Sequence, residues 1–125
     1  MTVERYAAVD HVTVSRRGEL RDRVDEVIAA LGHERRVIVS APATDTALQL
    51  ARDTDVVVTL PEAVTRSARD QLGLTMLPLP FELPPVPLYL LWHQRYDDDP
   101  AHTWLLNLAT QTLQDLFAAP DAGDQ

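Results

Sequence analysis

The chain of 125 residues contains no cysteine and only 4 glycines. The absence of cysteine excludes a disulfide framework, a thiolate nucleophile and thiolate zinc sites. The glycines form neither GxGxxG nor GxxxxGK(S/T), and no serine lies in GxSxG, so the common phosphate cradles and the nucleophile elbow are not predicted. The four histidines are scattered and form no HExxH motif. We therefore expect no metal, no cofactor and no enzymatic activity.

Positive charge and long apolar runs are also scarce. Lys and Arg total 11 against 19 Asp and Glu, which gives a formal net charge of −8. This charge disfavours direct contact between this chain and a nucleic-acid backbone. No apolar run approaches the ~18 residues of a spanning helix, and the first ten residues lack the apolar region of a signal peptide. The length of the chain fits a single globular domain. We expect the protein to be cytoplasmic and to make no contact with a membrane.

Three short runs rich in β-branched residues are the most informative feature present. They are Val12–Ser15, Val37–Ser40 and Val56–Leu60, and amphipathic segments separate them. Because strands that alternate with helices form parallel sheets, the pattern predicts an α/β fold with a mainly parallel βαβαβα order.

The intervening segments show helical spacing and stop signals. Leu20, Val24, Val27, Ile28 and Leu31 form one apolar stripe, and Gly32 follows as a C-terminal stop. For the second helix, Thr44 or Asp45 is expected to accept hydrogen bonds from first-turn amides. The third is expected to run from Pro61 to Gln71, with Gly73 as its stop.

The composition of the chain changes after Leu74, where proline becomes frequent. Five prolines fall within residues 78–87, which predicts a stiff, extended crossover. Leu88–His93 then predicts a buried strand, and Asp97–Pro100 predicts the start of a long helix. The apolar residues of that helix are Trp104, Leu105, Leu108, Leu113, Leu116 and Phe117.

The strand-to-helix corners are the candidate ligand site. In a parallel sheet the carboxyl ends of the strands share one edge, where helix N-termini offer unpaired N–H groups. Such an edge suits a small polar or anionic ligand, although the same residues also serve as ordinary helix caps. The candidate binding residues are Ser15, Pro42, Ala43, Thr44 and Thr59.

Other chemistry-bearing residues have ordinary structural explanations. Asp97–Asp99 could suggest a hard-cation site, but a solvated helix cap is the favoured interpretation. Trp92 and Trp104 could stack on a ligand, but core packing explains them better. Arg16 and Arg17 could clamp a carboxylate, although a surface pair beside a turn is commoner.

The order of several short motifs resembles the C-terminal half of the effector-binding region of LysR-type transcriptional regulators. The resemblance extends to about Leu113 and rests on the order and spacing of the motifs together. These are Arg5-Tyr6, His11-Val-Thr-Val-Ser15-Arg-Arg-Gly18, Val24-Asp25, Ala29-Ala30-Leu31-Gly32, Thr54-Asp55-Val-Val-Val-Thr59-Leu60-Pro61-Glu62, Leu77-Pro-Leu-Pro80, Leu88 to His93 and Asp99-Pro-Ala-His102-Thr-Trp104-Leu105.

The resemblance implies half of a fold like that of type II periplasmic binding proteins. Residues 1–80 would be the second subdomain of the effector-binding region, and residues 81–125 the crossover strand and C-terminal helix of an incomplete first subdomain. Met1 would then be an expression start or the start of a truncated gene. The implied function is that of a regulatory fragment that senses a small-molecule effector while lacking the DNA-binding domain of the parent protein.

Two expectations about binding and assembly follow. The family often places an effector-binding hydroxyl at the position of Ala43, so either Thr44 supplies it here or the pocket is more apolar. The strand at Leu88–His93 and the helix from Pro100 to Phe117 would lack their sheet, so they should pack against a partner in a homodimer or fold back. The alternative to an effector-binding fragment is a stand-alone oligomerisation or interaction module derived from such a regulator.

Overall fold

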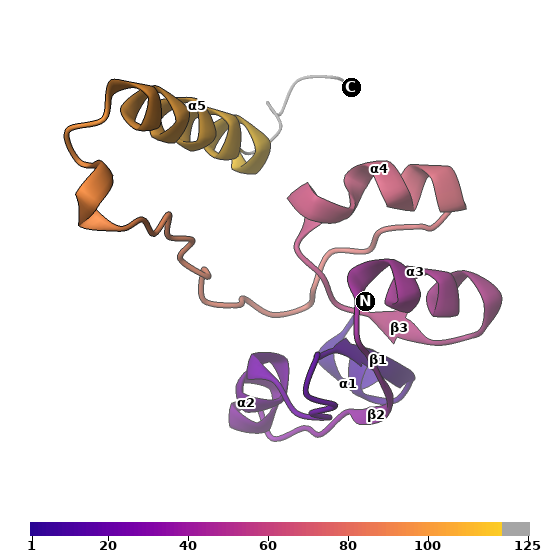
Figure 1. Ribbon diagram of the computed structural model, residues 1–125. Coiled ribbons are helices and arrows are strands. Elements are labelled where there is room, and N and C mark those ends of the chain that lie inside the picture. Colours follow the sequence, from indigo (N-terminus) through magenta and orange to yellow (C-terminus); the bar gives the residue numbers. More distant parts are fainter. Residues whose placement is uncertain (119–125) are drawn as a thin grey trace. The chain divides into compact units, whose positions relative to one another are not determined.

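The computed structural model describes residues 1–118, so the end of the predicted segment 81–125 lies outside the described residues. The chain divides into two compact units, Met1–Pro84 and Pro85–Gln125 (Figure 1). The assignment of residues 1–80 and 81–125 to two subdomains remains a prediction.

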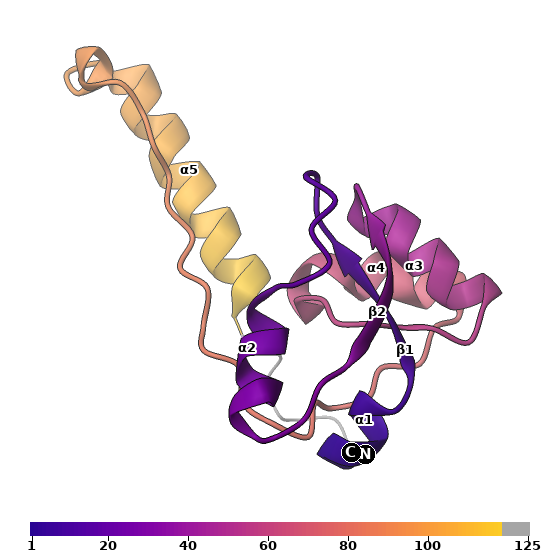
Figure 2. The same ribbon diagram turned by 90° about the horizontal axis from the view of Figure 1, so that it is seen from below.

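Three parallel strands form the sheet of the first unit. They are β1 (Asp10–Val14), β2 (Arg36–Ala41) and β3 (Val57–Val58), in the order β2-β1-β3. Figure 2 shows β1 and β2 running side by side in the same direction. The predicted parallel arrangement is confirmed, although β3 is shorter than the run Val56–Leu60 that predicted it.

Local sequence explains where the first helices begin. Thr2 caps a short helix, α1 (Val3–Ala7), which the sequence analysis did not predict. Helix α2 (Arg23–Ala30) begins after Asp22, which forms a capping box with Asp25. The apolar stripe predicted for this helix is therefore too long, because Leu20 and Leu31 lie outside α2 and are each 50% exposed.

The next two helices complete the βαβαβα order. Helix α3 (Thr44–Asp53) has Ala43 at its N-cap position, and no side chain among residues 1–118 caps it. The expectation that Thr44 or Asp45 caps this helix is wrong, because both residues already lie inside its first turn. Helix α4 (Glu62–Leu72) ends at Gly73, whose φ of +66° explains why glycine stands there.

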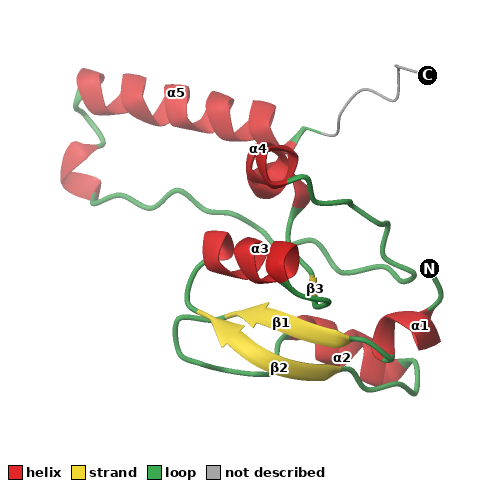
Figure 3. Ribbon diagram, turned by 90° about the vertical axis from the view of Figure 1, so that its right-hand side faces the viewer, coloured by secondary structure: helices red, strands yellow, loops and turns green. Residues whose placement is uncertain are grey.

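Two small cores cover the two faces of the sheet. Val12, Ala41 and Ala47 form the core beneath α3, which Figure 3 shows lying over the sheet. Tyr6 packs with the α2 residues Val24 and Ile28 to form the other core. A buried parallel strand needs apolar side chains on both faces, and β3 provides them, since Val57 packs against the Tyr6 cluster and Val58 against the Val12 cluster.

The second unit contains a 3₁₀ turn (Gln94–Tyr96) and helix α5 (Pro100–Phe117). Asp99 caps α5 as the acidic run predicts, accepting hydrogen bonds from the backbone N–H groups of Ala101 and His102 at 2.9 and 3.3 Å. Within residues 1–118, no helix combines the length and the apolar character required to cross a membrane.

The predicted buried strand at Leu88–His93 is wrong as a secondary-structure assignment. These residues form no strand, and Tyr89 and Leu91 are 78% and 91% exposed. A strand exists only through hydrogen bonds to a neighbour. The described part of the second unit contains no other strand that could provide them.

Candidate ligand-binding rim

Two of the predicted strand-to-helix corners meet at the carboxyl edge of the sheet. The backbone N–H of Ser15 donates to the carbonyl oxygen of Ala41 at 2.9 Å, so the chain leaves β1 directly beside the start of the Pro42–Thr44 corner. The Ser15 hydroxyl oxygen accepts hydrogen bonds from the N–H groups of Arg17 and Glu19, both at 3.2 Å. Its own proton stays available for an acceptor outside the turn.

The start of α3 supplies unpaired donors to this edge. The first-turn N–H groups of a helix have no partner inside the helix, and a capping side chain usually satisfies one or two of them. Ala43 has no side-chain acceptor, and no side chain among the described residues replaces it. The backbone N–H groups of Thr44, Asp45 and Thr46 are therefore open to an anionic group, which the helix dipole also favours.

Thr59 stands apart from the other four predicted residues. It follows β3, which lies across β1 from β2. Its hydroxyl oxygen lies 2.7 Å from that of Tyr6, so its hydrogen bonding is already engaged by a core residue. We call the other four positions, Ser15, Pro42, Ala43 and Thr44, together with the first-turn N–H groups of α3, the rim.

A polar network that the sequence analysis missed connects α2 to β1 and to Arg35 within the first unit. The Arg35 side chain is 1% exposed, and its guanidinium lies 2.8 Å from an oxygen of Asp22 and 2.9 Å from one of Asp25. Asp22 also accepts a hydrogen bond from the Thr13 hydroxyl at 2.9 Å, which connects the start of α2 to β1.

This network shifts the pKa values of Asp25 and Arg35. Burial by itself raises the pKa of the Asp25 carboxyl, but hydrogen bonds from Arg35 outweigh it and hold that pKa below its ordinary value. Burial likewise opposes the charged form of Arg35, yet the bond to Asp25 and the charge of Asp22 raise its pKa. Both ions therefore remain charged across the neutral range. The Asp22-x-x-Asp25 spacing was the available sequence signal for a capping box.

His11 is a second buried polar residue of this unit. It is 0% exposed and its Nε2 lies 2.8 Å from the carbonyl oxygen of Tyr6. A carbonyl oxygen can only accept, so Nε2 carries the proton of the neutral ring and Nδ1 does not. Nδ1 is buried without a partner in the described residues. Burial and the nearby Arg35 charge lower the pKa of His11, although the Tyr6 hydrogen bond and the Asp25 and Asp10 charges act in the opposite direction.

We expect stability to fall as the pH drops below the ordinary histidine value of 6.5. Because the pKa of His11 is lowered in the folded chain, the unfolded chain binds the proton at a higher pH than the folded chain does. The contribution of neutral His11 to the free energy of unfolding is therefore fully present above the ordinary value and is lost as the pH falls below it. Urea midpoints between about pH 7.5 and about pH 5.5 measure this loss. His11→Gln, which keeps a donor for the Tyr6 carbonyl, should reduce the loss, and the exposed-site control His93→Gln should retain it. Equal pH dependence in all three proteins would contradict the expectation.

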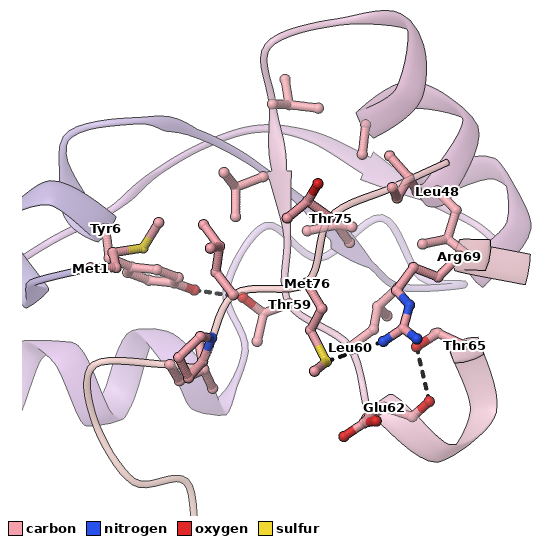
Figure 4. Close-up of a pocket in the computed structure, with 18 residues that line it drawn as sticks. Met1, Tyr6, Leu48, Thr59, Leu60, Glu62, Thr65, Arg69, Thr75 and Met76 are labelled. Atoms are coloured by element: carbon pink, nitrogen blue, oxygen red, sulfur yellow. Dashed lines mark hydrogen bonds between the residues drawn. The ribbon is translucent and has the colours of Figure 1, made fainter. Parts of the chain in front are cut away.

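A cavity of about 290 Å³ lies elsewhere in the first unit, beside β3 (Figure 4). Thr59 is the one predicted site residue that lines it, and the rim residues do not. Among residues 1–118, no group of three or more histidine, aspartate or glutamate side chains could hold a metal ion.

The family profile described as the LysR substrate binding domain matches residues 1–114. The chain belongs to this family. The predicted resemblance and its α/β fold are thereby confirmed.

Curated relatives of this LysR-type domain are transcriptional regulators. SyrM, an HTH-type transcriptional regulator of Rhizobium meliloti, is 34% identical over 105 residues, which cover 83% of this chain and 32% of SyrM. NahR, an HTH-type transcriptional activator of Pseudomonas putida, is 29% identical over 117 residues, which cover 94% of this chain and 38% of NahR. The chain thus spans about a third of the length of these relatives.

Solved structures agree with the LysR-type fold. The regulatory domain of MexT, a transcriptional activator in Pseudomonas aeruginosa, is 28% identical with a TM-score of 0.73, covering 89% of this chain and 56% of the MexT chain. A solved Vibrio parahaemolyticus protein has a TM-score of 0.75 over 95% of this chain and 56% of its own. The sequence identity is 24%, so this similarity supports the fold alone.

Proposed function

We propose that this chain is the effector-recognition half of a LysR-type regulatory domain and that the rim holds a polar or anionic group of a small-molecule effector. The observation that carries the proposal is the uncapped start of α3, which lies beside the Ser15 turn at the carboxyl edge of a parallel sheet. Family membership supports the regulatory role. The parent regulator would bind DNA through another part of its chain, and this chain, with its charge of −8, would make no direct contact with it.

The chemistry of the rim indicates the class of effector. Three backbone N–H groups and one serine proton are all donors, so they suit a carboxylate or a similar acceptor. The chain covers 56% of the MexT regulatory-domain chain, so under this proposal the rim would be one wall of a larger site. A rim with one wall should bind weakly, because affinity for a small ligand depends on burying most of its surface.

Nuclear magnetic resonance titration with benzoate tests this proposal. We expect saturable chemical-shift changes at millimolar benzoate in the amides of Ser15 and residues 43–46, and none with neutral benzyl alcohol. The variant Ala43→Asp supplies the missing cap, because the extended backbone of Ala43 (φ −143°, ψ 153°) suits a capping side chain. This variant should gain about 1 kcal/mol of stability while losing benzoate binding.

Pro61→Asp is the matched control. It adds the same charge at the N-cap of α4, which also has no side-chain cap. Benzoate binding at the rim should survive in this control. Binding that persists in Ala43→Asp, or shifts that never saturate at the rim, would contradict the proposal.

A further inference from the structure

The cavity beside β3 differs from the rim in both its place and its chemistry. Its volume is about 290 Å³, and most of its lining comes from residues 56–60 and 74–79. In these two stretches Thr59 and Thr75 are the only polar residues, and Thr75 is exposed. Sites for small molecules are lined mainly by apolar side chains with a few polar groups, and their volumes begin at about 300 Å³. The cavity therefore has the lining and the size of a site for a small, largely apolar molecule.

Most polar side chains of the cavity already have partners. The hydroxyl oxygens of Tyr6 and Thr59 lie 2.7 Å apart. The Thr65 hydroxyl donates to two backbone carbonyl groups of the preceding turn, at 3.1 and 3.2 Å. The Glu62 carboxylate lies 3.6 Å from the guanidinium of Arg66, one turn further along α4. These groups therefore gain little from a ligand.

Arg69 is the exception. Its Nε and Nη2 atoms donate to Oδ1 of Asp70 at 3.0 and 2.9 Å, but its Nη1 donates to the Met76 sulfur at 3.4 Å (Figure 4). A thioether is a weak acceptor, whereas a guanidinium is a charged donor. The Arg69 side chain is 21% exposed, so water reaches it only in part. The cavity thus contains a charged donor that lacks a strong acceptor.

The Met76 side chain can give way to a better acceptor. Methionine is unbranched and adapts readily, and Met76 is 52% exposed, so little packing holds it in place. A carboxylate at Nη1 of Arg69 would form a charge-assisted hydrogen bond, which is about twice as strong as a neutral one. The valine and leucine side chains of residues 56–60 and 74–79 would cover an aliphatic chain attached to that carboxylate.

We propose that this cavity is a second ligand site, independent of the rim, and that it binds a medium-chain aliphatic carboxylate. The carboxylate replaces the Met76 sulfur at Nη1 of Arg69, and the aliphatic chain lies between residues 56–60 and 74–79. One water molecule occupies about 30 Å³, so the cavity has room for roughly ten of them. Octanoate has a similar number of non-hydrogen atoms and is therefore the probe.

Nuclear magnetic resonance titration of the whole chain with octanoate tests the proposal. We expect saturable shifts in the amides of residues 56–60 and 74–77. Octanoate should bind about tenfold more tightly than octan-1-ol, which has the same aliphatic chain but no charged acceptor. Equal affinities for the two compounds, or shifts at these amides that never saturate, would overturn the proposal.

Arg69→Met should remove the preference for octanoate over octan-1-ol. Arg52→Met is the matched control, because Arg52 makes the same kind of pair with the aspartate that follows it but does not line the cavity. The control should keep the preference. A preference that survives in Arg69→Met would show that Arg69 does not hold the carboxylate.

Two further variants separate the cavity from the rim. Ala51→Leu enlarges a side chain that lines the cavity and should weaken the binding of both compounds at least tenfold. Ala43→Asp, which closes the anion site of the rim, should leave octanoate binding at residues 56–60 unchanged. Octanoate binding that is lost in Ala43→Asp, or unchanged in Ala51→Leu, would place the carboxylate outside the cavity and overturn the proposal. Circular dichroism verifies that each variant is folded.

Discussion

Replacing Arg35 by methionine should lower the free energy of unfolding by about 3 kcal/mol, because removal of one partner leaves the others charged and poorly solvated. Arg35 is the common partner of Asp22 and Asp25, whose side chains are 35% and 19% exposed. Their partial contact with water places the expected loss at the low end of the range for buried pairs.

The neighbouring arginine is the matched control for this variant. Arg36 pairs with Asp10, but its side chain is 74% exposed. Arg36→Met should therefore cost less than about 1 kcal/mol. Urea unfolding followed by circular dichroism compares the two variants. Arg35→Lys should recover only part of the loss, since one ammonium group cannot reproduce the forked contact with two carboxylates. Equal stabilities of Arg35→Met and Arg36→Met would contradict the assigned role of Arg35.

The alternation of strands and helices was predictable because local sequence determines it. Runs of β-branched residues fit a pleated, buried surface, and Gly73 ended α4 where the sequence analysis expected a stop. Helix starts were less predictable, since they depend on which side chain caps the first turn. The apolar stripe suggested that α2 begins near Leu20, whereas the Asp22 capping box starts it at Arg23.

The rim was predictable only in part. The parallel topology places Ser15 beside the Pro42–Thr44 corner, and that topology follows from the element order. The engagement of Thr59 by Tyr6 joins residues 53 positions apart, and no local pattern encodes it. The same holds for Arg35 and His11. Both are buried by tertiary packing, although arginine is usually exposed and histidine is only intermediate in burial.

The segment Leu88–His93 shows a different limit of sequence patterns. Its composition is that of a buried strand, but pairing is a property of two segments and cannot be read from one. The same reasoning applies to α5, where Trp104 and Leu105 are 65% and 53% exposed. Apolar sequence thus identifies surfaces that need a partner without saying which partner covers them.

Ile28→Ala should lower the free energy of unfolding of the first unit by about 3 kcal/mol, because the variant leaves a cavity in a core that cannot collapse fully. Ile28 is 0% exposed and packs with Tyr6 and Val24.

The matched control is Ile38→Ala in β2, where the isoleucine is 47% exposed and the cost should stay within about 1 kcal/mol. Circular dichroism must follow the unfolding of the first unit, since Trp92 and Trp104 both lie in the second. Equal stabilities of Ile28→Ala and Ile38→Ala would contradict the assigned role of Ile28.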